Sequence, residues 1–241
     1  MSRQRLDDAL IGRGSAKDKQ EAFVMVTEGR VFVDGQKAVS PGRIVGDHAK
    51  IEVRSAQRFV GRGAYKLEEA LDAFKIDAAG KVCADIGAST GGFTEALLER
   101  GAKKVYAIDT ARGKLALKLR TDQRVAVMER TDVRDLASLP EPMDIAVIDV
   151  SLIPLREILP SVRRLLRPQA QVVALFKPQY ETHDPRMLRR GIIREDSDRD
   201  ALLKNFMGWL ETNGWRILNQ IKSPILGSKG NVEYLLYLRH L

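Results

Sequence analysis

Four ionisable residues lie where predicted strands or helices begin or end, and their types could bind and move a proton. Asp149 ends the apolar run DIAVID, Lys177 ends QVVALFK, and Glu233 opens EYLLYL, while Lys66 lies beside the apolar stripe of the predicted helix in GRGAYKLEEAL. Taken singly, each is more often an ordinary surface charge. Because the carboxyl ends of parallel strands share one edge of a sheet, we expect the four side chains to face one crevice.

A glycine-rich segment, DIGASTGGFT at residues 85–94, lies where a short apolar strand turns into a helix. Glycines let a ligand approach the backbone, and the first amides of a helix offer hydrogen-bond donors. The pattern is G-x-x-x-G-G and not the dinucleotide pattern G-x-G-x-x-G. The segment by itself is therefore a weak indication of a nucleotide site.

Acids at the ends of the next two predicted strands strengthen this interpretation. Asp109 follows Gly87 by 109 − 87 = 22 residues, close to the roughly 20-residue interval at which an acid meets a ribose diol. Asp132 follows the third strand, where it could meet an adenine edge. This ordered set resembles the S-adenosylmethionine site of Rossmann-like methyltransferases. The expected cofactor-binding residues are Asp85, Gly87, Ala88, Ser89, Thr90, Gly91, Gly92, Phe93, Asp109 and Asp132.

A nicotinamide dehydrogenase is the rival interpretation of the same loop. The third glycine of its fingerprint is missing, and the sequence offers no base for hydride transfer. The methyltransferase interpretation is therefore preferred.

From residue 64 onward, short apolar strands alternate with helical segments, a pattern typical of a mostly parallel sheet covered on both faces. The strands are predicted at KVCADIG, KKVYAID, RVAVMER, DIAVIDV and QVVALFK. The tail from residue 215 holds two more strands with no helix between them, so the last strand should enter antiparallel. The predicted fold class is α/β, with a Rossmann-like sheet over residues 64–241.

Residues 1–59 form a different pattern, with two short helical segments followed by small strands and an Asp34-Gly35 turn. Eleven Lys and Arg residues face eight acids here. The arrangement R-L-D-x-x-L-x-x-R-G, followed by EGRVFVDGQ, resembles the S4-type RNA-binding domain. Residues 60–63, which contain Gly-Arg-Gly, are expected to be a bendable linker.

Composition excludes several classes of protein. The 241 residues contain one cysteine and three scattered histidines, too few for an internal disulfide or the usual zinc ligand sets. No apolar run approaches the roughly 20 residues that span a bilayer, and the first residues lack an apolar signal core. We therefore expect a cytoplasmic protein that uses no metal. The net charge of +8 suits a polyanionic partner.

The four ionisable positions resemble the Lys-Asp-Lys-Glu tetrad of the FtsJ-like RNA 2′-O-methyltransferases. Around them, GRGAYKLEEAL, GASTGGFTEALLERGAKKVYAID, ERTDVRDL, IDVSLIPL, FKPQYE and GNVEYL are similar to the TlyA subfamily, the haemolysin A proteins, over nearly the whole chain. The family often has Asn at the position of Asp132 and a longer segment at residues 110–113. These differences fall at positions that are expected to contact the adenine and the substrate, and the four residues of the tetrad are unchanged.

The resemblance implies S-adenosylmethionine-dependent 2′-O-methylation of a ribose in ribosomal RNA, of cytidine by the family's preference. Lys177 would act as the base or hold the developing alkoxide, Asp149 would orient it, and Lys66 and Glu233 would fix the ribose. The expected RNA-binding residues are Arg5, Arg13, Lys17, Arg58, Arg62, Arg189 and Arg190.

Three alternatives stay open on the sequence. Carbon-5 pyrimidine methylation needs a cysteine nucleophile, but Cys83 lies inside an apolar strand and is better interpreted as core. A ribosome-assembly factor could keep the fold without the activity, although the intact tetrad argues against it. The third alternative is a membrane-lytic protein, which is what the family's historical name implies. The sequence contains no strongly amphipathic segment that would support it.

Overall fold

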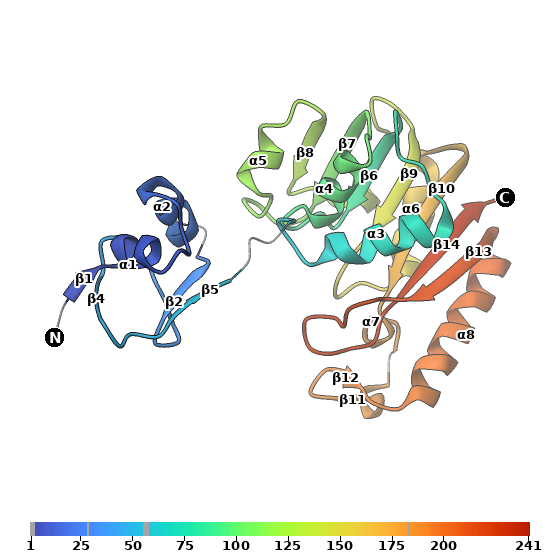
Figure 1. Ribbon diagram of the computed structural model, residues 1–241. Helices are drawn as coiled ribbons and strands as arrows, with labels where there is room; N and C mark the ends of the chain where they lie inside the picture. The colour runs from blue at the N-terminus through green and yellow to red at the C-terminus, as the bar shows by residue number, and fades with distance from the viewer. Residues whose placement is uncertain (1–2, 28, 55–57, 183) are drawn as a thin grey trace. The chain divides into compact units, whose positions relative to one another are not determined.

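The computed structural model describes residues 3–27, 29–54, 58–182 and 184–241. The chain divides into two compact units, residues 1–58 and residues 59–241. Figure 1 labels most of the helices and strands of each unit.

The smaller unit combines two helices with short antiparallel strands. Its elements are β1 (Arg3–Arg5), α1 (Leu6–Gly12), α2 (Lys19–Thr27), β2 (Val31–Val33), β3 (Gln36–Lys37), β4 (Ile44–Gly46) and β5 (Ile51–Val53). The sheet order is β3-β2-β5, and β1 pairs separately with β4. Asp34 and Gly35 both have positive φ, as a tight hairpin turn requires. The strand β1 is not predicted by the sequence, because RQR carries no apolar alternation.

The larger unit is built on a seven-stranded sheet. Its first half contains α3 (Gly63–Phe74), β6 (Val82–Ile86), α4 (Gly92–Glu99), β7 (Lys104–Asp109), α5 (Leu117–Arg120), β8 (Val125–Glu129), the 3-10 turn η1 (Val133–Asp135) and β9 (Met143–Ile148). Its second half contains α6 (Leu155–Leu165), β10 (Leu166–Phe176), α7 (Pro178–Glu181), η2 (Pro185–Met187), β11 (Leu188–Arg189), β12 (Ile192–Ile193), α8 (Asp196–Thr212), β13 (Trp215–Lys222) and β14 (Tyr234–His240).

The strand order in this sheet is β13-β14-β10-β9-β6-β7-β8. Strands β8, β7, β6, β9 and β10 run parallel, and β14 is antiparallel to both of its neighbours, as the sequence predicts. Parallel strands place their carboxyl ends at one edge, so the loops after β6, β7, β9 and β10 gather there.

Helices cover both faces of the sheet, and successive strand residues point to opposite faces. In β6, Cys83 packs with α3 and α4 on one face, while Ala84 packs with α6 and α8 on the other. The near-continuous apolar strands of the sequence arise from this two-sided burial.

Residues 60–63 are not the linker that the sequence suggests, because they pack into the larger unit. Phe59 is 2% exposed and contacts the ring of Tyr65 edge-on, with 5.2 Å between ring centroids. The Val60 amide donates to Glu95 Oε2 at 2.6 Å, and the Arg62 guanidinium donates to the carbonyl of Leu226 at 3.0 Å. The boundary between the units therefore falls between residues 58 and 59.

Candidate active site

The four ionisable residues singled out by the sequence line one cavity of about 440 Å³. Lys66 reaches it from α3, Asp149 from the loop after β9, Lys177 from the end of β10, and Glu233 from the residue before β14. The cavity lies at the carboxyl edge of the parallel strands, where the sequence predicts a shared crevice.

The tetrad consists of two buried ion pairs. Lys66 Nζ lies 2.5 Å from Glu233 Oε2, and these side chains are only 9% and 4% exposed. Lys177 Nζ lies 2.5 Å from Asp149 Oδ1, with the aspartate side chain 24% exposed. Burying charges costs free energy even when they are paired. Two such pairs around one cavity therefore point to chemistry and not to fold stability.

The sequence does not identify Ser151 as part of this site. Lys177 Nζ donates to Ser151 Oγ at 3.0 Å, so two of the three ammonium protons already have acceptors. The third proton remains for a group in the cavity. A serine two residues after a strand-end aspartate carries no signal of its own, and only the loop geometry brings it to the lysine.

A second cavity, of about 430 Å³, adjoins the first. The two share Gly87, Ser89, Asp149, Ser151 and Leu152 as lining residues. The second cavity is also lined by Asp109, Asp132 and a group of apolar side chains. That apolar group consists of Ile86, Ile108, Val133, Val150, Ile153 and Ile158.

Gly87 brings the two cavities together. Its φ is +88°, and a Cβ at this position would lie 2.4 Å from the carbonyl oxygen of Asp149. No side chain fits between these strand ends, so the glycine lets the loop after β6 pass directly beside the loop after β9.

Asp109 lies at the end of β7 with both carboxylate oxygens directed by backbone amides. Oδ2 accepts from the Ser89 amide at 2.7 Å, and Oδ1 accepts from the Ala111 amide at 2.7 Å. Each oxygen keeps a lone pair for a hydroxyl group. The carboxylate is thus fixed at the cavity wall in a geometry suited to a ribose diol.

The second cavity fits S-adenosylmethionine in size and chemistry. Its volume lies within the roughly 300–1,000 Å³ usual for small-molecule sites. Apolar walls suit an adenine ring, and Asp109 suits the ribose hydroxyls. The shared residues lead from this cavity directly to the two ion pairs.

Asp85 does not line either cavity, contrary to the expectation from the sequence. It is fully buried, and its Oδ2 accepts from both the amide and the hydroxyl of Thr94 in α4. Oδ1 has no hydrogen-bond partner among the described residues. Desolvation by burial raises the pKa of Asp85 to about 7. The carboxyl group anchors the start of α4 to β6 and lies too deep to contact a ligand.

Most of the glycine segment also lies away from the two cavities. Ala88, Thr90, Gly91, Gly92 and Phe93 are absent from the walls of both cavities. At Gly91, where φ is +96°, a Cβ would lie 2.2 Å from Leu119 Cδ1. At Gly92 it would lie 3.0 Å from the amide nitrogen of Ala64. These glycines allow close packing of α4, so only Gly87 and Ser89 of the segment face the cavities.

Asp132 lines the second cavity, but its carboxylate is committed to Arg134. Oδ2 accepts from Nη2 of Arg134 at 2.7 Å, and Oδ1 caps η1 by accepting from the Arg134 amide at 2.9 Å. The hydrogen bond with the Arg134 guanidinium lowers the pKa of Asp132. An adenine contact through this carboxylate would have to compete with the arginine.

Cys83 is inside the core, as the sequence predicts. It is 0% exposed, and burial raises the pKa of its thiol to about 12. Such a thiol does not supply a nucleophilic thiolate near neutral pH.

The expected RNA-binding residues are in several environments. Arg5 is held by Asp7, with 2.8 Å between Nη2 and Oδ2, and Arg13 donates to the carbonyl of Ala49. Arg62 is occupied by Leu226, as described above. Exposed side chains are found at Lys17, Arg58, Arg189 and Arg190.

Neither a metal-ligand cluster nor a membrane-spanning helix is present among residues 3–27, 29–54, 58–182 and 184–241. No group of three or more His, Cys, Asp or Glu residues there is arranged to hold a metal ion. Within the same residues, every helix is too short or too polar to cross a membrane.

Comparisons with known proteins indicate the same class of protein as the geometry of the site, a methyltransferase. Residues 59–240 match the FtsJ-like methyltransferase family. A solved S-adenosylmethionine dependent methyltransferase from Mesorhizobium loti superposes with a TM-score of 0.52 at 17% identity, covering 72% of this chain and 96% of that one. That likeness concerns the fold alone, and it confirms the predicted Rossmann-like α/β class.

Closer relatives cover both units. The chain is 40% identical over 241 residues to the 16S/23S rRNA (cytidine-2′-O)-methyltransferase TlyA of Mycobacterium tuberculosis, spanning 98% of this chain and 90% of that protein. A solved structure from Streptococcus thermophilus superposes over 100% of this chain and 89% of its own, with a TM-score of 0.75 at 35% identity. The chain belongs to the FtsJ-like methyltransferase family and, within it, to the TlyA proteins.

Proposed function

We propose that this protein transfers a methyl group from S-adenosylmethionine to the 2′-hydroxyl of a cytidine in ribosomal RNA. One observation supports this most: the Lys66–Glu233 and Lys177–Asp149 pairs line a single cavity that adjoins a nucleoside-sized one. The rRNA substrate and the cytidine follow the printed name of the Mycobacterium tuberculosis relative. A substrate of this kind would place the protein in the cytoplasm.

Three residues would hold the cofactor. Asp109 would accept hydrogen bonds from the ribose hydroxyls, and the backbone around Gly87 and Ser89 would lie against the part of the molecule shared with the catalytic cavity. When bound, the cofactor supplies a sulfonium-activated methyl group. Everything else that the reaction needs comes from the chain itself.

The chain must orient the ribose hydroxyl and remove its proton as the oxygen–methyl bond forms. Lys177 would direct its remaining N–H toward the 2′-oxygen, with Asp149 and Ser151 holding the other two. For Nζ to accept the hydroxyl proton, the ammonium must first give one of its protons to Asp149, whose side chain reaches solvent. The neutral amine then takes the hydroxyl proton as the oxygen–methyl bond forms. The ammonium then stabilises the negative charge that develops on the oxygen.

Lys66 and Glu233 would position the sugar. Only one Lys66 proton faces Glu233 in the ion pair, so the others can donate to ribose oxygens. Glu233 balances the second cation, which keeps the cavity near neutrality before the substrate arrives.

The smaller unit is proposed to be an S4-type RNA-docking module. It carries an excess of basic residues, and the relatives that match nearly the whole chain include this part. Lys17 and Arg13 lie near its first two helices and are the candidates for phosphate contact.

The test is tritiated-methyl transfer to unmodified 16S and 23S rRNA, followed by alkaline hydrolysis at the modified nucleotide. A 2′-O-methyl group makes the adjacent linkage resistant, whereas a base methyl group does not. K177A should bind S-adenosylmethionine normally in isothermal titration and lose transfer. Full transfer by K177A would remove the proposed role of Lys177. No transfer by the wild-type protein, with normal cofactor binding, would favour a non-catalytic assembly factor.

A further inference from the structure

One wall of the catalytic cavity carries exposed cations that the proposed chemistry does not use. The hairpin β11–β12 lines the cavity through Leu188 and Gly191, and the loop before β14 lines it through Lys229. Arg189 and Arg190 lie between the two lining residues of the hairpin, and both are exposed.

The turn of the hairpin lies against the ammonium group of Lys229. Arg190 and Gly191 have φ values of +55° and +79°, the positive values of a tight two-residue turn. A Cβ at Gly191 would lie 3.6 Å from Nζ of Lys229. The ammonium therefore rests against the tip of the hairpin, next to Arg190.

These cations differ from other arginines nearby in lacking acidic partners. Arg186 pairs with Asp184, and Arg199 pairs with Asp196. Arg189, Arg190 and Lys229 have no ion pair or side-chain hydrogen bond with any described residue. Like charges gathered beside a cavity repel one another unless an anion joins them.

Asn231 fixes the two segments of this wall to each other. It is 3% exposed, its Oδ1 accepts from the Ile193 amide at 3.1 Å, and its Nδ2 donates to the Gly191 carbonyl at 2.8 Å. One amide side chain thus joins the hairpin to the loop that carries Lys229.

The same loop touches the tetrad. The carbonyl of Asn231 accepts from the Gly227 amide at 2.9 Å. A Cβ at Gly227 would lie 2.4 Å from Glu233 Oε1. A shift of the loop would therefore disturb the Glu233 carboxylate as well as the cations.

We propose that Arg189, Arg190 and Lys229 form a phosphate-binding rim for the RNA strand on either side of the target ribose, with Asn231 as the positioning residue that couples this rim to Glu233. The proposal rests on the proposed RNA-directed function. It adds Lys229 and Asn231 to the site. It also states that the rim binds backbone phosphates and does not recognise bases.

The experiment measures binding of the full chain to unmodified 16S and 23S rRNA transcripts between 50 and 200 mM KCl. Each phosphate contact that is removed should make the slope of log K against log [KCl] shallower by about 0.7 to 0.9. K229A and R190A should each show this change, with a raised KM for RNA and an unchanged kcat.

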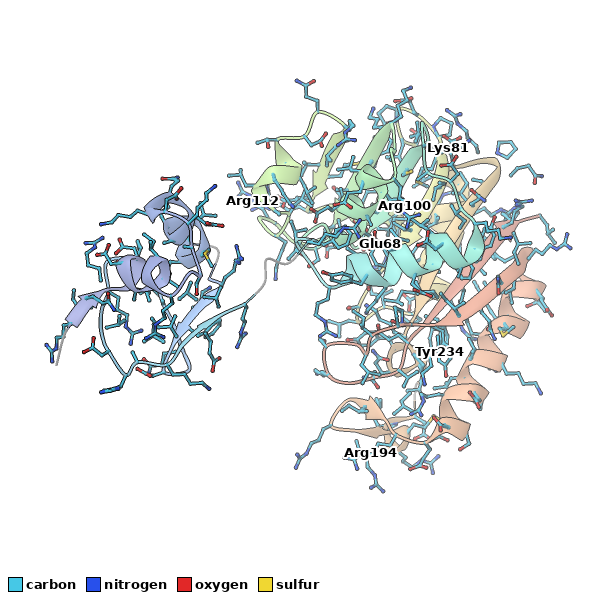
Figure 2. The ribbon with its side chains drawn as sticks, viewed as in Figure 1. Glu68, Lys81, Arg100, Arg112, Arg194 and Tyr234 are labelled. Atoms are coloured by element: carbon cyan, nitrogen blue, oxygen red, sulfur yellow. The ribbon has the colours of Figure 1, made fainter. Side chains whose placement is uncertain are left out.

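The matched control is K81A. Lys81 is exposed and precedes β6, at the opposite end of that strand from Gly87. Figure 2 labels Lys81 and Arg194, the residue that follows β12, at opposite ends of the larger unit. K81A should keep the wild-type slope. Equal slopes for K229A, R190A and the wild type would refute the proposal that these residues bind RNA phosphates.

Asn231 is tested by N231A and N231D, with thermal melting and S-adenosylmethionine binding as controls for folding. N231D keeps the acceptor for Ile193 but places a buried carboxylate oxygen against the Gly191 carbonyl, so its defect should be at least as large as that of N231A. Both variants should raise KM for RNA and lower kcat, because the rim and Glu233 move together. A fall in kcat with a wild-type salt slope would refute the coupling. If wild-type protein binds RNA with the expected salt dependence but transfers no methyl group, the proposed function fails while the rim stands.

Discussion

Replacing Asp85 by Asn should remove an unfavourable pH dependence of stability. The pKa of Asp85 is raised from 3.8 to about 7, so the folded protein holds this proton more tightly than the unfolded chain. The contribution of Asp85 to stability is therefore greatest below about pH 4, falls as the pH rises toward 7, and stays low above that. An asparagine does not ionise and removes this dependence.

The magnitude follows from the difference between the two pKa values. Three pKa units correspond to about 4 kcal/mol at pH 8, and the part already lost at pH 5 is about 1.5 kcal/mol. The stability difference between D85N and the wild type should therefore change in favour of D85N by about 2.5 kcal/mol from pH 5 to pH 8. The amide oxygen can still accept from Thr94, and any penalty for the buried NH₂ group is the same at both pH values.

The assay is urea unfolding of both proteins at pH 5 and pH 8. Effects of titrating groups that do not interact with Asp85 cancel in the comparison. D77N serves as the control, because Asp77 is exposed and its Oδ1 accepts from the neighbouring Ala79 amide. A D85N difference that is the same at both pH values would refute the inference that a buried carboxyl group opposes its own ionisation here.

Three further outcomes follow from the structure. Cys83, with a thiol pKa near 12, should resist iodoacetamide in the native protein at pH 8 and react after unfolding, as mass spectrometry would show. G91A should lose about 2 kcal/mol or more of stability in thermal unfolding, because the new Cβ meets Leu119 at positive φ; wild-type stability would contradict this packing. S151A should lower kcat about tenfold, through one lost hydrogen bond from Lys177, while S-adenosylmethionine binding is retained; an unchanged kcat would show that the serine does not orient the lysine.

The sequence predicts much of the larger unit because its signals are local. Apolar runs of strand length, separated by helical segments, predict the parallel sheet, and the absence of a helix before the last strand predicts its antiparallel direction. Asp109, Asp149 and Lys177 are identified as site residues because they end such strands. The boundary between the two units is harder to predict from the sequence. The Gly-Arg-Gly of residues 61–63 indicates a linker, whereas in the structure the neighbouring Phe59 is buried in the core.

The amino-acid sequence by itself determined which reactive groups exist and at which edge of the sheet they emerge, since the end of a strand is fixed by its own residues. Only the tertiary structure decided their partners. Lys66 and Glu233 are 167 residues apart, and their pairing depends on how α3 and β14 close against the sheet. The fold also joined Asn231 to the carbonyl of Gly191, which lies 40 residues earlier in the chain. Such contacts depend on packing between distant segments, which no local pattern of residues encodes.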